Sequence, residues 1–392
     1  MLAEMPIIDT DTHVCEPADL WTSRLSSARW GDAIPHVAYD ERRGEDIWLI
    51  GGRKVSGVAG YANAGWREYP PRHPRRIEDA HPNAFGAEAR VARMNRYGVA
   101  AEAIYPNLLA FSTHNFRSIG DPELLLECVR AYNDFQTDFA SEAPGRFIVQ
   151  TVLPFWDLQA SVAEIERCRE NGHHGVLFMT KPHKFDLPRL GDRHWDPILR
   201  TAADCNSCVS FHIGFQQTTD EDWRRMFTKA RDPSDYALET SLSMIGLAEG
   251  LGEVLMSDIC HRYPTLQFAL VESGFGWIPY FLETLDWQWV NSGAATAHPA
   301  REIPSFYFRR QVKTAFWFEQ ETVRRMADLY PDNVMVESDF PHPTCLEPGP
   351  TSSSGTVREV LTATLAGLPE ELCRKVLYEN AAQLYGVDAR TS

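Results

Sequence analysis

Short apolar runs, rich in β-branched and aromatic residues, alternate with segments of helical periodicity along most of the chain. Runs of this kind predict buried strands, whereas apolar residues spaced three and four positions apart predict helices. We expect strands at residues 6–9, 101–105, 147–152, 175–179, 208–212, 267–271, 312–316 and 333–337. Helical spacing is clearest at residues 157–169, 196–203 and 278–289. Eight strands separated by helices predict an α/β fold, a parallel (β/α)8 TIM barrel.

The length of the chain leaves room for insertions in such a barrel. The chain has 392 residues, whereas a typical barrel of this kind takes about 250. We expect a single domain over residues 1–392, with a long insertion after the first strand, at about residues 21–88. Shorter insertions are expected at 215–234 and 345–355.

The charge balance restricts the partners of the protein. The chain has 54 acidic and 38 basic residues, a formal net charge of −16 at pH 7. Such a surface repels nucleic-acid phosphates and anionic lipids, so we expect a small-molecule substrate and no nucleic acid or membrane as a partner. We find neither a run of roughly 18 apolar residues nor a secretory signal at the first residues. Eight cysteines are too few for a disulfide scaffold, and we expect a cytoplasmic protein.

The end of the first predicted strand carries the strongest chemical signal, Asp-Thr-Asp-Thr-His at residues 9–13. Side chains alternate across a strand, so Asp11 and His13 project to the same side. A carboxylate oxygen and an imidazole nitrogen are both ligands of divalent cations. The alternative is that Asp11 caps a following helix and that His13 is packed or solvated.

Two other predicted strands end in residues of the same types. The fifth strand ends in His212, and the eighth is followed by Ser-Asp, in which the aspartate is Asp339. The C-terminal ends of barrel strands open on one face, where the active sites of this fold lie. The side chains expected to meet there are Asp11, His13, His212 and Asp339.

Further motifs lie between the predicted strands. Arg-Met-Asn-Arg-Tyr-Gly-Val at 93–99 precedes the second strand, and His-Trp-Asp-Pro at 194–197 precedes the fifth. Tyr-Pro-Thr-Leu at 263–266 precedes the sixth, and Glu-Asn-Ala-Ala at 379–382 lies in the last predicted helix. With the candidate metal ligands, these motifs make nearly the whole chain resemble the amidohydrolase superfamily. In particular, the chain resembles the branch that contains aminocarboxymuconate-semialdehyde decarboxylase and γ-resorcylate decarboxylase.

The resemblance implies a metal site and its ligands. The first-strand pair of the family, His-x-His or Glu-x-His, corresponds to Asp11 and His13, its fifth-strand histidine to His212 and its eighth-strand aspartate to Asp339. Members of the family hold a divalent ion there, so we expect one zinc ion, with manganese as the alternative. Zinc lowers the pKa of bound water to about 7, and Asp339 is placed to move the proton of that water. The resemblance also implies a homo-oligomer, a dimer or a larger assembly.

The chain departs from the decarboxylases at three places. Glu272 stands where their sixth strand ends in a histidine, and His342 stands where several carry an aromatic residue. The first ligand pair begins with the shorter aspartate, and Glu16 offers one additional oxygen ligand. A carboxylate at Glu272 can act as a general base on water, which favours hydrolysis. The alternative for Glu272 is a buried residue that forms an ion pair with an arginine.

Three functions remain open on these residues. The first is a metal-dependent hydrolase that cleaves an amide, ester or C–C bond in a small aromatic or carboxylated substrate, with Asp339, Glu272 and His342 as catalytic residues. The second is a metal-dependent, non-oxidative decarboxylase of an aromatic or unsaturated carboxylic acid, in which Asp339 relays a proton. The third is a catalytically inactive barrel that binds a ligand. Glu272 and His342 favour the hydrolase.

Overall fold

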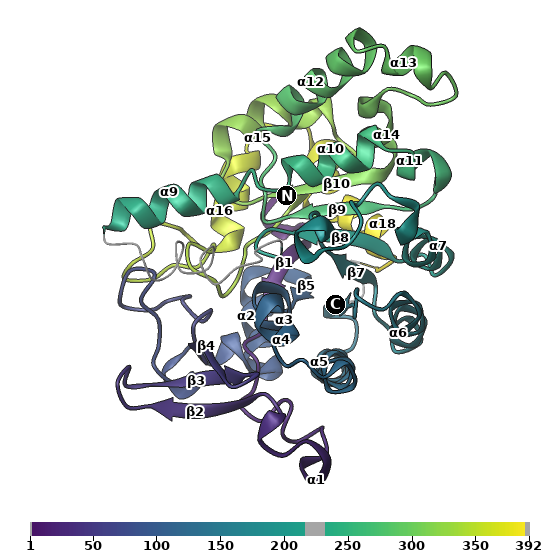
Figure 1. Ribbon diagram of the computed structural model, residues 1–392. Helices are drawn as coiled ribbons and strands as arrows, with labels where there is room; N and C mark the ends of the chain where they lie inside the picture. Colours follow the sequence, from purple (N-terminus) through teal and green to yellow (C-terminus); the bar gives the residue numbers. More distant parts are fainter. Residues whose placement is uncertain (1, 216–231, 389–392) are drawn as a thin grey trace.

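The computed structural model describes residues 2–215 and 232–388, and a closed barrel of eight parallel strands lies at its centre (Figure 1). The order around the barrel is β1-β11-β10-β9-β8-β7-β6-β5. These strands are β1 (Ile7–His13), β5 (Val99–Tyr105), β6 (Phe147–Val152), β7 (Gly175–Phe178), β8 (Cys208–His212), β9 (Phe268–Val271), β10 (Val312–Phe316) and β11 (Val334–Val336). Each overlaps a predicted run, and the predicted (β/α)8 TIM barrel is confirmed.

The barrel strands are buried along their entire length, including their outer faces. A strand that is covered on both faces reads in the sequence as an unbroken apolar run, which is why these eight strands could be predicted. The covering helices surround the barrel in Figure 1. The larger ones are α2 (Ala87–Tyr97), α5 (Pro122–Ser141), α6 (Leu158–Glu170), α7 (Asp196–Asp204), α9 (Pro233–Ser243), α10 (Ala248–Met256), α12 (Ile278–Asn291), α14 (Pro304–Gln311), α15 (Gln320–Met326), α16 (Val357–Leu365) and α18 (Asn380–Tyr385). The shorter ones are α1 (Ser27–Trp30), α3 (Leu108–Phe111), α4 (Thr113–Arg117), α11 (Ile259–Arg262), α13 (Ala294–Ala297) and α17 (Glu370–Arg374).

Helix α5 illustrates how the local sequence sets a covering helix. The carboxylate of Asp121 accepts hydrogen bonds from the backbone N–H groups of Glu123 and Leu124, which caps the N-terminus. Pro122 occupies the first helical position, where a backbone N–H would have no partner within the helix. Buried side chains recur at helical spacing and face the barrel at β6; they include Leu125, Cys128, Val129 and Tyr132.

The long insertion after β1 contains a separate antiparallel sheet that the hydrophobic pattern did not predict. Its order is β2-β3-β4, with β2 (His36–Asp40), β3 (Glu45–Ile50) and β4 (Arg53–Gly57), and it lies beside the barrel in Figure 1. Trp48 of this sheet is buried against Trp21, with ring centroids 5.2 Å apart, and both rings belong to the main core. The insertion is therefore packed onto the barrel.

The other expected insertions have different outcomes. Residues 345–355 contain no helix or strand, as expected for a loop, whereas most of 215–234 lies outside the described residues. Within the described ranges, no helix is both long and apolar enough to cross a membrane. All eight cysteines are free thiols.

Candidate functional site

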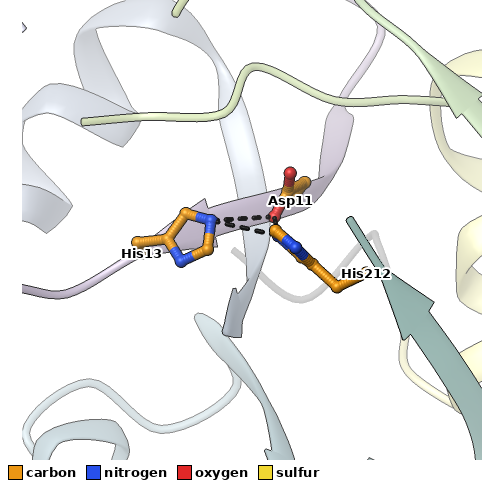
Figure 2. A group of neighbouring side chains, drawn as sticks. All are labelled: Asp11, His13 and His212. Carbon is orange, nitrogen blue, oxygen red and sulfur yellow. Dashed lines mark hydrogen bonds and ion pairs between the residues drawn. The ribbon is translucent and has the colours of Figure 1, made fainter. Parts of the chain in front are cut away.

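Three side chains from two strand ends meet at the mouth of the barrel (Figure 2). Nε2 of His13 lies 3.4 Å from Oδ1 of Asp11 and 3.2 Å from Nε2 of His212. The third side of this triangle, from Oδ1 of Asp11 to Nε2 of His212, measures 3.3 Å. His13 is the last residue of β1 and His212 the last residue of β8, and all three side chains are buried. The convergence follows from the parallel order of the barrel strands.

The triangle has the dimensions of one face of a tetrahedral metal site. Ligand atoms at about 2.0–2.1 Å from a central ion lie about 3.3–3.4 Å from one another. Neither carboxylate oxygen of Asp11 has a hydrogen-bond partner among the described residues, although the side chain is fully buried. A buried carboxylate that accepts no hydrogen bond is costly, and a cation in the triangle would compensate it. These residues therefore fit a divalent ion.

Asp339 provides the fourth expected group. The chain turns sharply after β11, and Asp339 adopts a left-handed backbone conformation with a φ of 58°. Its backbone N–H donates to the carbonyl oxygen of Asp11 at 3.0 Å, and its Oδ1 lies 3.6 Å from Nε2 of His13. The structure thus brings together all four residues that the sequence placed at one site, and their role as metal ligands stays a prediction.

The charges in this cluster depend on one another. Burial favours the neutral form of Asp11, but the imidazoles of His212 and His13 outweigh burial and lower the pKa of Asp11 to about 2. Burial lowers the pKa of His13 to about 4. Burial has the same effect on His212, but Asp11 and Glu272 outweigh it and raise the pKa of His212 to about 9. The protein therefore stabilises a positive charge beside Asp11, where a cation fits.

Glu272 reaches the cluster from the residue that follows β9. Its Oε2 lies 3.4 Å from Nδ1 of His212, and burial raises the pKa of Glu272 to about 8. The partner of Glu272 within the described chain is thus a histidine and not the arginine of the alternative expectation. Its backbone is left-handed, with a φ of 54°, and its N–H donates to Oε2 of the buried Glu337 at 3.0 Å. Glu337 therefore helps to hold a strained conformation that directs Glu272.

His342 joins the cluster from the loop after β11. Its ring stacks on the ring of His13, with centroids 3.7 Å apart and planes 13° apart. Nδ1 of His342 lies 2.9 Å from Oδ1 of Asp339, and Nε2 lies 2.7 Å from Oδ1 of Asn107. The sequence indicated His342 but not Asn107, because a single asparagine after the second barrel strand carries no signal of its own.

Glu16, the possible additional metal ligand, lies outside the cluster. Its Oε1 accepts hydrogen bonds from the backbone N–H groups of Asn107 at 3.1 Å and Leu108 at 2.9 Å. The hydroxyl of Tyr132 donates to the same oxygen at 2.8 Å. The groups that meet as candidate metal ligands do not include Glu16. Glu16 instead fixes the start of α3.

A cavity of about 580 Å³, counted with its open mouth, lies over the cluster. Glu272, Asp339 and His342 contribute acidic and polar groups to its lining. Aromatic rings from three elements also line the cavity: Tyr61 of the insertion, Phe111 of α3 and Tyr236 of α9. No sequence motif indicated these three residues, although each follows a barrel strand on the C-terminal face, where this fold places its active site.

A buried ionic network lies behind the cluster, and no sequence pattern indicated it. Glu102 of β5 forms ion pairs with Arg90 at 2.9 Å and with Arg93 at 3.2 Å, and all three side chains are buried. Arg90 also donates to the carbonyl oxygens of His13 and of Asn83. The network thereby connects α2 to the end of β1, which carries two of the candidate metal ligands.

Comparison with known proteins identifies relatives of the chain. The sequence profile of the amidohydrolase family matches residues 8–387. The amidohydrolase map2389c from Mycobacterium avium subsp. paratuberculosis K-10 gives a TM-score of 0.73 at 22% identity, covering 97% of this chain and 99% of that chain. The 5-carboxyvanillate decarboxylase LigW from Sphingomonas paucimobilis gives 0.63 at 18% identity, covering 98% and 100%.

A dihydroxybenzoic acid decarboxylase from Polaromonas sp. JS666, solved with manganese and 2-nitroresorcinol, gives a TM-score of 0.61 at 17% identity, covering 97% of both chains. At these identities the solved structures establish the shared fold. No curated protein matches the chain.

Proposed function

Because the chain belongs to the amidohydrolase family, we propose that it is a metal-dependent hydrolase, which uses water to cleave an amide, ester or activated C–C bond in a small substrate. The observation that carries this proposal is the carboxyl group of Glu272 in the cavity wall. Ligand atoms of Asp11, Glu272 and Asp339 all lie within 4.8 Å of one another. A water molecule in the cavity would therefore meet the carboxyl group of Glu272 next to Asp339, one of the candidate metal ligands.

We assign one divalent ion to Asp11, His13, His212 and Asp339. Two imidazoles and two carboxylates suit zinc first, and manganese is the alternative. A bound divalent ion supplies Lewis acidity, which polarises a substrate carbonyl and lowers the pKa of water. Histidine ligates as the neutral imidazole, so the ion would replace the positive charge that Asp11 otherwise induces on His212.

Glu272 acts as the general base in this proposal. Its Oε2 accepts a proton from water as the water oxygen attacks the substrate carbonyl carbon, and the same carboxyl group then protonates the leaving group. Burial raises the pKa of Glu272, which makes its carboxylate a stronger base. Asp339 orients the water from the other side, and Tyr61 and Phe111 pack against an aromatic part of the substrate.

The aromatic wall of the cavity also suits a second candidate function, decarboxylation of an aromatic carboxylic acid. In that reaction the metal ligands would hold an ion that binds the substrate carboxylate and a neighbouring oxygen, and Asp339 would deliver a proton to the ring carbon. Glu272 would then have no essential proton to transfer. The two functions therefore differ in what Glu272 must do.

Isotope and product analysis tests the proposal on a panel of aromatic esters, amides and acids. In water labelled with oxygen-18, a hydrolase transfers the label into its product, whereas a decarboxylase releases carbon dioxide. Glu272→Gln should lower the kcat of hydrolysis by about 10²- to 10⁴-fold. Glu321→Gln, at an exposed position of α15, is the matched control and should leave kcat unchanged.

Three results would contradict the proposal. A wild-type rate in Glu272→Gln would favour the decarboxylase over the hydrolase. Asp339→Asn should abolish turnover in either reaction, so full activity in that variant would refute the assigned site. Tight ligand binding without turnover or bound metal would favour an inactive ligand-binding barrel.

We also propose a homo-oligomer, a dimer or a larger assembly, that acts in the cytoplasm. The large apolar side chains of Tyr280, Trp287 and Val290 are exposed on α12, which supports an interface there. Free thiols at all eight cysteines support a reducing compartment. Light scattering after size-exclusion chromatography would measure the assembly.

A further inference from the structure

Asn107 is completely buried behind the wall of the cavity, between β5 and α3. Its backbone is fixed by Glu16, whose Oε1 accepts from the N–H of Asn107 and from the N–H of the next residue, Leu108. Because Oε1 also accepts from the hydroxyl of Tyr132, Glu16 is itself held in place. The position of the Asn107 side chain is therefore set by contacts that involve none of the candidate metal ligands.

The side-chain amide of Asn107 has only one orientation that satisfies its neighbours. Nδ2 donates to the carbonyl oxygen of Val14 at 3.0 Å, and a carbonyl oxygen can only accept. The amide oxygen Oδ1 must then face Nε2 of His342, at 2.7 Å. Because an amide oxygen also can only accept, Nε2 of His342 carries a hydrogen and donates it to Asn107.

With its hydrogen on Nε2, the neutral ring has no hydrogen on Nδ1, which lies 2.9 Å from Oδ1 of Asp339, an oxygen without a hydrogen-bond partner among the described residues. The ring plane is fixed as well, because His342 stacks on His13 at 3.7 Å. A ring turned by 180° would replace the hydrogen bond from Nε2 to Asn107 by a contact between carbon and oxygen. The orientation of the His342 ring beside Asp339 thus depends on one buried amide.

We infer that Asn107 is a positioning residue, which holds the ring of His342 with Nε2–H towards Asn107 and Nδ1 towards Asp339. The catalytic consequence of this inference rests on the proposed function, since it concerns the carboxyl group that orients the attacking water. The hydrogen-bond pattern does not rest on that function. A measurement of the ring itself can therefore separate the two.

The test compares two substitutions with opposite hydrogen-bonding ability. Asn107→Leu keeps a side chain of similar size and removes the acceptor, whereas Asn107→Asp keeps an acceptor for Nε2–H. Nitrogen NMR of the zinc-reconstituted protein labelled with ¹⁵N-histidine reports which ring nitrogen carries hydrogen, and His342→Gln identifies the signal. We expect an Nε2–H signal in wild type and in Asn107→Asp, and its loss or mixing with the other tautomer in Asn107→Leu.

Kinetics provide the second readout. Asn107→Leu should lower kcat by about 10- to 100-fold, with little change in KM. Losses of this size are typical when a residue that orients the groups of a metal site through a hydrogen bond is replaced. Asn107→Asp should recover most of that loss. Asn133 offers a matched control, because it is buried, donates to the carbonyl oxygen of Val152 and does not line the cavity. Asn133→Leu should lower the Tm without altering the His342 signal or kcat at 25 °C.

Two outcomes would overturn the inference. One is a wild-type ring with hydrogen on Nδ1 and none on Nε2; the other is an Asn107→Leu variant with unchanged NMR signal and unchanged kcat. A different failure concerns the proposed function alone. If the tautomer changes as expected but no substrate incorporates oxygen from water, the positioning role of Asn107 stands and the hydrolase does not.

Discussion

Replacement of Glu102 by glutamine should expose the energetic role of the buried network behind the cluster. Glu102 is the only carboxylate among the described residues that forms an ion pair with Arg90, whereas Arg93 has a second partner in Glu347 at 2.8 Å. Glu102→Gln therefore leaves one buried guanidinium without a counter-charge, bonded only to carbonyl oxygens such as that of Asn83. Removal of one partner of a buried ion pair costs about 3–5 kcal/mol.

The expected shift in melting temperature follows from the length of the chain. At about 2.1 cal/mol/K for each of the 392 residues, the unfolding entropy is about 0.8 kcal/mol/K. A loss of 3–5 kcal/mol then lowers the Tm by about 4–6 °C. Differential scanning calorimetry of the zinc-loaded protein measures this shift directly.

Two comparisons make the Glu102 experiment decisive. Glu321→Gln removes an exposed ion pair with Arg325, which is worth less than about 1 kcal/mol, and should change the Tm by about 1 °C or less. The double variant Glu102→Gln/Arg90→Met should regain part of the lost stability, because it also removes the unpaired charge. A Tm of Glu102→Gln within 1 °C of wild type would refute the reasoning.

Three further predictions concern the metal, the cavity and pH. His212→Ala should lose the one zinc or manganese ion per chain that mass spectrometry should detect in the reconstituted wild type, whereas the exposed His298→Ala should retain it. Phe111→Leu should raise the KM for an aromatic substrate about 3- to 10-fold with little change in kcat, since it removes one ring contact in the cavity. Burial lowers the pKa of His173 from 6.5 to about 3. Between these pH values only the unfolded chain binds the proton. The free energy of unfolding should therefore decrease as the pH is lowered, by about 2 kcal/mol at pH 5. In urea titrations His173→Gln should lose correspondingly less stability between pH 7 and 5; an identical loss would refute this role.

The hydrophobic pattern predicted the barrel strands but not the sheet of the insertion, and burial explains the difference. The sequence of β8 is apolar up to His212 because both faces are covered. In contrast, β2 is only partly buried and carries an exposed tyrosine, Tyr39. Its pattern of apolar and polar residues therefore cannot be distinguished from that of a loop. Strand prediction succeeded where the surroundings of a strand are uniform and failed where they are mixed.

The candidate ligands could be predicted for a different reason. A parallel barrel places every strand end on one face, so topology alone brings together His13 and His212, which are 199 residues apart. No such rule places Asn107 behind His342, 235 residues away, or Arg90 under the carbonyl of His13. These contacts depend on how loops and helices pack behind the strands, and a single sequence carries no pattern for that packing.

Backbone strain provides a separate physical reason to place catalysis at this end of the barrel. Five non-glycine residues of the described chain have a left-handed φ, and three of them, Glu272, Asp339 and Thr344, line the cavity. Each such residue costs about 1–3 kcal/mol and persists only where its surroundings hold it. The hydrogen bonds from Glu272 to Glu337 and from Asp339 to Asp11 are such restraints. The strained backbone at Glu272 and Asp339 fixes the direction of both carboxyl groups in the cavity. Proton transfer to or from water requires such a fixed direction.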